Sequence, residues 1–227
     1  MTEAQHTTHE ERHRALVERL AANLRPVRRL WPVSVRLRLW LVLQLALLVW
    51  VASHTPNDFM SKLAGPRYLL EVVLFAGSAI LAAVMAFRGA IPGRPVRIGE
   101  LAIALVALAA GTALLMTQPL RTAYPLSQFI DVGRICALET CLLAAVPWVG
   151  LWWAVRRGAP MRAWTTGLAV GAAAALFSFA LMRLKCPNDE RLHLLTWHLV
   201  PAIIIVLLST LAGALWLRLR PRSSGLR

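Results

Sequence analysis

Six apolar stretches follow one another along the chain and predict six membrane-spanning helices. They are rich in Leu, Ala and Val, and several carry a Trp or Tyr near an end, where an aromatic ring suits the boundary between lipid and water. A helix needs about 20 residues to cross the hydrocarbon layer of a bilayer. Isolated strands are excluded, because their backbone groups would lack hydrogen bonds in lipid. The predicted spans are residues 37–52, 68–87, 101–118, 135–155, 164–182 and 199–217.

The predicted fold class is therefore all-α, an integral membrane bundle of six transmembrane helices. It occupies residues 37–217, between a leader (1–36) and a short basic tail (218–227). The chain is 58% hydrophobic and 16% charged, whereas a soluble domain has about 45–50% apolar and about 25% charged residues. The spans leave no room for a separate soluble enzyme domain. Since the sequence also lacks a Ser-His-Asp set, a phosphate loop and an HExxH motif, an enzyme is not expected.

The positive charge of the chain predicts its orientation. The net charge is +14, and the leader, the second and fourth loops and the tail hold 18 of the 25 Lys and Arg residues, against 7 on the other side. Cytoplasmic segments carry the excess of Lys and Arg, so both termini are predicted to be cytoplasmic. Because topology accounts for the basic charge, we expect contact with membrane lipids and no direct binding of nucleic acid.

The leader contains a further predicted helix, which starts at about residue 10. Leu16, Leu20 and Leu24 recur every four residues beside Glu and Arg side chains, a pattern typical of an amphipathic helix. The polar run 2–8 before it is expected to be disordered. The leucine stripe either lies on the membrane surface, with Arg side chains toward anionic lipid, or docks into a groove on a cytoplasmic partner. The residues alone favour the membrane surface.

All three cysteines fall on the outer side of the predicted topology. Cys136 and Cys141 are five residues apart, or about 140° around a helix, so they cannot pair while the helix persists. Cys186, in the loop before the last span, should reach only the cysteine nearest the outer surface. That cysteine is Cys136, one residue into the fourth predicted span. Cys136 and Cys186 are therefore the candidate redox pair, in a compartment where disulfides persist, and Cys141 is expected to face lipid or neighbouring helices.

The same region offers candidate metal ligands. Cys136, Cys186, His193 and His198 would combine thiolates with imidazoles, a donor set that suits thiophilic cations. Their spacing matches no established zinc signature. A cysteine in a membrane helix is often only a small apolar side chain, and an interfacial histidine is often only a hydrogen-bonded anchor. The residues alone favour these structural roles.

Ionisable residues are scarce within the predicted spans. Glu71, Glu100 and Glu139 lie near helix ends, so none lies at mid-depth, where transporters and proton relays place such groups. A small transporter or channel is therefore the weaker alternative, as is a structural subunit of a larger membrane complex. Gly167 and Gly171 are expected to allow close packing of two helices.

Several motifs together resemble one known family. They are LAANLRPVRRL at 20–30, AFRGAIPG at 86–93, RRGAP at 156–160 and CPND at 186–189, followed by His193 and by Trp197-His198. With Cys136 at the start of the fourth span, this arrangement resembles the NrsF-type membrane proteins. These are negative regulators of sigma F-like extracytoplasmic-function sigma factors in Proteobacteria.

The resemblance implies an anti-sigma factor of the bacterial inner membrane. Its partner would be an extracytoplasmic-function sigma factor, released under heavy-metal or oxidative stress. The two signalling cysteines of the family would correspond to Cys136 and Cys186, and the leader with Leu16, Leu20 and Leu24 becomes a candidate partner-binding element. No cofactor is implied beyond a transiently bound heavy-metal ion, and the oligomeric state is not implied.

Overall fold

The computed structural model of the protein describes residues 3–22, 30–55, 58–94, 98–120, 125–158 and 160–219. These residues form helices and connecting segments and contain no strand, as the all-α prediction requires. The helices are α1 (Glu3–Ala22), α2 (Val33–Ser53), α3 (Asp58–Ala64), α4 (Pro66–Gly89), α5 (Ile98–Met116), α6 (Leu126–Val155), α7 (Ala163–Lys185), α8 (Arg191–Leu194), the π-helix η1 (Leu195–Leu199) and α9 (Val200–Leu219).

Helix α1 belongs to an N-terminal unit, Met1–Leu30, that is distinct from the rest of the chain. The helix begins at Glu3 and not at about residue 10, so the prediction of disorder for the polar run is wrong from Glu3 onward. Leu16 and Leu20 are exposed, and Leu24 lies outside the described residues. The amphipathic role of this helix stays a prediction.

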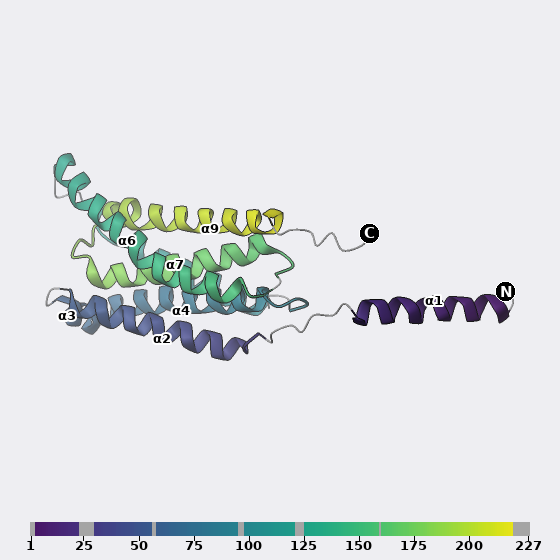
Figure 1. Cartoon of the computed structure of the whole chain (residues 1–227). Coiled ribbons are helices and arrows are strands. Elements are labelled where there is room, and N and C mark those ends of the chain that lie inside the picture. The colour runs from purple at the N-terminus through teal and green to yellow at the C-terminus, as the bar shows by residue number, and fades with distance from the viewer. Residues whose placement is uncertain are drawn as a thin grey trace. The chain divides into compact units, whose positions relative to one another are not determined.

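Helix α7 is the central helix of the second unit, Trp31–Arg227. It contacts α2, α4, α6 and α9, and Figure 1 shows α2, α4, α6 and α9 arranged about it. Of the 18 most apolar consecutive residues of α7, 78% are buried, whereas the share is 22–44% for the other four long helices. Small residues allow this close packing: a Cβ at Gly167 would lie 2.4 Å from the Ser209 carbonyl oxygen, and the Ser209 hydroxyl donates to the Gly167 carbonyl at 2.7 Å.

Helices occur at all six predicted span positions, and over the described residues five of them have the length and apolarity of a membrane span. The five are α2, α4, α6, α7 and the continuous segment Arg191–Trp216. Helix α5 has 19 residues, of which Ala102–Met116 are described as an apolar stretch, and it is not among the five. Glu100 precedes this stretch and pairs with Arg88 of α4. Six crossings and the orientation of the bundle stay predictions.

Two predicted helix starts are corrected by the structure. Helix α6 begins at Leu126 and not at residue 135, so Cys136 lies well inside it and Asp131 is a helical residue. Pro125 caps the N-terminus of α6, and Asp131 forms an ion pair with Arg134 at 3.2 Å on the exposed surface. The N-terminal turns of α6 are therefore polar and extend the helix beyond its apolar part. The last helical segment likewise begins at Arg191, eight residues before the predicted start at 199.

The two ends of this bundle have different cores. One end, which we call the phenylalanine end, packs Trp40, Phe87, Leu151 and Val155 into an apolar cluster with many alanines. The opposite end, which we call the cysteine end, holds a smaller cluster that includes Cys136 and Cys186. Chemistry-bearing side chains gather at the cysteine end.

Candidate functional site

The site at the cysteine end begins with two buried thiols. Cys186 caps the C-terminus of α7, where its backbone N–H donates to the Met182 carbonyl at 2.8 Å. Cys136 reaches it from the third turn of α6, and the two Sγ atoms lie 3.8 Å apart. Both cysteines are free and buried, whereas Cys141 is free and exposed on another side of α6. The structure therefore brings together the two cysteines of the predicted pair, and leaves the third apart.

Two histidines complete the group, and a π-helix brings them together. His193 and His198 are five residues apart, which in an α-helix would separate them by about 140°. Here η1 widens the helix: the Val200 N–H donates to the carbonyl of Leu195, five residues earlier. The wider turn directs both imidazoles toward the thiols. The ring centroids of His193 and His198 lie 5.2 Å apart, and each histidine is 1% exposed. Pro201 follows directly, and because it has no N–H it cannot supply the next regular hydrogen bond.

The four predicted metal-ligand residues thus form one buried cluster. One donor atom each from Cys136, Cys186, His193 and His198 can be chosen so that all lie within 4.8 Å of one another. Cys186 Sγ lies 3.5 Å from His193 Nε2. The hydrogen bond with Cys136 lowers the pKa of the Cys186 thiol, against the opposing effect of burial, and the hydrogen bond with His193 lowers the pKa further.

Aromatic rings enclose the cluster on two sides. Phe129 of α6 lies with its ring centroid 5.6 Å from Trp197 and 6.3 Å from His193. Phe179 of α7 lies 6.3 Å from His198. Gly133 makes room for this arrangement, because a Cβ there would lie 2.0 Å from Cε2 of Trp197. The enclosure limits access of water to the thiols and imidazoles.

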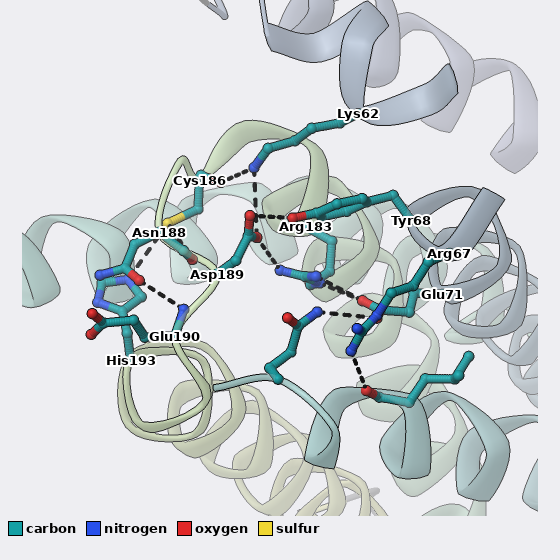
Figure 2. A network of polar contacts seen from close by, with 12 residues as sticks. Lys62, Arg67, Tyr68, Glu71, Arg183, Cys186, Asn188, Asp189, Glu190 and His193 are labelled. Atoms are coloured by element: carbon teal, nitrogen blue, oxygen red, sulfur yellow. Dashed lines mark hydrogen bonds and ion pairs between the residues drawn. The ribbon is translucent and has the colours of Figure 1, made fainter. Parts of the chain in front are cut away.

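A buried ionic network lies next to the cysteines and fixes the loop that carries Cys186 (Figure 2). At its centre is Arg183, which is 1% exposed. Its guanidinium contacts Glu71 of α4 at 2.8 Å and Asp189 of the loop at 2.8 Å. Tyr68 donates a hydrogen bond to Asp189. Two carboxylates therefore share the positive charge of one buried arginine.

Further cations join this network at its edges. Lys62 of α3 donates to the Cys186 carbonyl and lies 3.7 Å from Asp189. Arg67 contacts Glu71 at 3.2 Å and donates to Thr117 at 2.6 Å. The loop after α7 is thereby tied to α3 and α4, and α4 in turn to the end of α5. Sequence reasoning missed this network; the one available signal is that charges of both signs occur at neighbouring helix ends.

Comparison with known families now identifies the chain. Residues 20–219 match NrsF, described as negative regulator of sigma F. The chain belongs to the NrsF family. Comparison with curated proteins and with solved structures gives no match. The NrsF match contains the whole helical bundle and all four residues of the cluster, and it includes Leu20 and Leu24 but not Leu16.

Membership in the NrsF family assigns a regulatory role. A negative regulator of a sigma factor is an anti-sigma factor, which belongs to a non-enzymatic class and has a sigma factor as its partner. The five long apolar helices are consistent with a membrane location for this NrsF protein.

Proposed function

We propose that this NrsF protein holds an extracytoplasmic-function sigma factor at the bacterial inner membrane and releases it under heavy-metal or oxidative stress. The observation that carries the proposal is the NrsF match over residues 20–219, which spans the bundle and both buried cysteines. The excess of Lys and Arg in the leader, the second and fourth predicted loops and the tail supports cytoplasmic termini as part of this proposal. The cysteine end then faces the periplasm, and the sigma factor binds on the opposite side.

The sensor in this proposal is the pair Cys136 and Cys186. Hydrogen peroxide would join the two sulfur atoms into a disulfide, taking up two electrons and two protons and leaving as two molecules of water. A disulfide bond is about 2.05 Å long, whereas the sulfur atoms lie 3.8 Å apart, so the reaction draws α6 and the end of α7 together. A heavy-metal ion would bind the same thiols.

Helix α7 supplies the route from the sensor to the sigma-binding side. It begins at Ala163, ends at Lys185 directly before Cys186, and contacts the long helices α2, α4, α6 and α9 along its length. Because its surroundings are closely packed, a displacement at the cysteine cap is passed on to the helices that touch it. A shift from 1:99 to 99:1 between two states requires a difference in ligand affinity of about 5.5 kcal/mol, which is less than the about 10–16 kcal/mol that structural zinc sites provide.

The sigma factor is proposed to bind the leader. Leu16 and Leu20 are exposed along α1, and leucines at this spacing, with Leu24 four residues further along the sequence, suit a groove on a partner protein. The alternative for this stripe is the membrane surface. Retention of the sigma factor by the membrane fraction after Leu16→Glu with Leu20→Glu would contradict the leader as the binding element.

A reporter gene driven by a sigma F-dependent promoter tests the proposal. Without the protein, the reporter should be strongly active in the absence of stress. With the wild-type protein it should be silent until cadmium(II) or hydrogen peroxide is added. Cys136→Ser and Cys186→Ser should each abolish the response to stress, while Cys141→Ser, the matched control, should respond like the wild type.

The outcomes separate the two parts of the proposal. If deletion leaves the reporter silent, the anti-sigma role lacks support. If deletion activates the reporter but both Cys136→Ser and Cys186→Ser still respond normally, the protein is an anti-sigma factor that senses stress elsewhere.

A further inference from the structure

The donor atoms at the cysteine end have the spacing of a tetrahedral metal site. Bonds of about 2.3 Å from zinc to sulfur and about 2.0–2.1 Å to nitrogen place two sulfur ligands about 3.8 Å apart, and a sulfur and a nitrogen about 3.6 Å apart. The observed separations are 3.8 Å between Cys136 Sγ and Cys186 Sγ, and 3.5 Å between Cys186 Sγ and His193 Nε2. These two distances between donor atoms therefore already match those around a tetrahedral zinc ion.

The hydrogen bonds of the Thr140 hydroxyl determine which ring nitrogen of His198 carries the hydrogen. This hydroxyl donates to the Cys136 carbonyl at 2.8 Å and lies 3.2 Å from His198 Nδ1. A hydroxyl has one proton, so Thr140 accepts its second hydrogen bond and His198 Nδ1 carries the donating hydrogen. The other ring nitrogen, Nε2, then has its lone pair free, the state in which imidazole binds a metal.

The free nitrogen of His198 has no partner in the part of the chain that the structure describes. Nε2 is buried and makes no hydrogen bond, and the whole side chain is 1% exposed. A buried polar atom without a partner has lost its hydrogen bonds to water and gained none in the protein, which destabilises the fold. A metal ion at the centre of the cluster would remove this cost.

We propose that Cys136, Cys186, His193 and His198 bind one divalent ion of the zinc class in tetrahedral geometry. Two sulfur and two nitrogen donors suit a borderline-soft cation, and hard cations such as Mg²⁺ and Ca²⁺ take oxygen ligands instead. Binding converts two thiols to thiolates and releases two protons. The two thiolates balance the charge of the ion, which keeps this buried site neutral. Thr140 acts as a positioning residue through His198.

The assignment of this ion as the sensed ligand rests on the proposed function, but binding itself does not. It is measurable on the purified full chain in detergent micelles, under reducing conditions and without a sigma factor. Zinc content after dialysis gives the stoichiometry. Cobalt(II) as the probe gives the geometry, because a tetrahedral site with thiolate ligands has intense visible d–d bands and a thiolate-to-cobalt charge-transfer band.

We expect one zinc ion per chain and a tetrahedral cobalt spectrum with the charge-transfer band. Cys186→Ser and His198→Ala should abolish both, whereas Cys141→Ser and His54→Ala, which change an exposed cysteine and an exposed histidine, should leave them intact. Thr140→Val should weaken cobalt binding about 10–100-fold while the spectrum stays tetrahedral.

The wild-type cobalt spectrum decides the proposal even if a variant fails to fold. An octahedral spectrum, or one without the charge-transfer band, overturns the site. So does zinc retained at one per chain by both Cys186→Ser and His198→Ala. If the spectrum is tetrahedral but the cysteine variants still respond normally to stress, the metal site is supported and its proposed role in sensing stress is contradicted. Absence of metal binding combined with loss of the stress response would leave a purely redox sensor.

Discussion

Two buried arginines, at opposite ends of the bundle, have contrasting surroundings. Arg183 at the cysteine end is 1% exposed and contacts two carboxylates. Arg36 at the phenylalanine end is 6% exposed, donates one hydrogen bond to the Phe87 carbonyl at 3.3 Å and lies 5.3 Å above the Phe87 ring. Its Nε and Nη1 have no hydrogen-bond partner among the described residues.

The contrast shows how differently the two ends are held together. The cysteine end depends on charges that compensate one another across α3, α4, α7 and the Cys186 loop. The phenylalanine end depends on apolar packing, in which a single cation is accommodated by a ring and a carbonyl oxygen. Removal of one charge should therefore be costly at the first end and tolerated at the second.

The largest effect is expected for Arg183→Met. The substitution leaves Glu71, which is 0% exposed, without its main partner, and breaking a buried ion pair in this way costs about 3–5 kcal/mol. The measurement is the free energy of unfolding in mixed micelles, with the exposed Arg134→Met as control. Adding Glu71→Leu should restore much of the loss; a double variant as unstable as Arg183→Met would contradict this account.

A smaller effect, confined to the loop, is expected for Asp189→Asn. The loss of charge weakens the contacts with Arg183 and Lys62, and hydrogen bonds to charged groups are worth about 1.5–3 kcal/mol. Cys186 should then react with a maleimide at least about tenfold faster, as followed by peptide mass spectrometry. The control is Asp131→Asn, whose carboxylate is exposed on α6. Equal labelling rates in both variants would show that the network does not hold the loop.

The smallest effect is expected for Arg36→Met. The methionine removes a buried charge that has one long hydrogen bond and keeps the apolar contact with Phe87, so the free energy of unfolding should change by less than about 1 kcal/mol. Arg38→Met, on the exposed side of α2, is the matched control. A loss as large as that of Arg183→Met would reveal an anionic partner of Arg36 outside the described residues.

Apolar periodicity predicted the helices well and their ends poorly. The first turns of α6 contain Ser127, Gln128 and Asp131, which no hydropathy argument assigns to a helix that crosses a membrane. The choice of Cys136 as the partner of Cys186 rested on its being at the outer helix end, but Cys136 lies well inside α6. The two thiols meet because Cys186 follows directly on the last turn of α7, which packs against α6.

The rest of the site depends on features that a regular helical pattern does not contain. With 3.6 residues per turn, His193 and His198 are expected to point in different directions, and only the position of Pro201 hints at the widened turn. The pairing of Glu71 with Arg183 joins residues 112 positions apart, so it depends on the packing of α4 against α7. The sequence pattern identified the residues of the cluster, and three-dimensional packing determines which of their atoms meet.

The π-turn at η1 also determines the rotational phase of the last helix. A π-turn accommodates one residue more than an α-turn, so the residues after it are rotated by about 100° relative to an uninterrupted helix. Ser209 and Gly213 of α9 therefore meet Gly167 and Gly171 of α7 only in the phase that η1 produces. The turn that aligns the two imidazoles also keeps the remote half of α9 in register with α7.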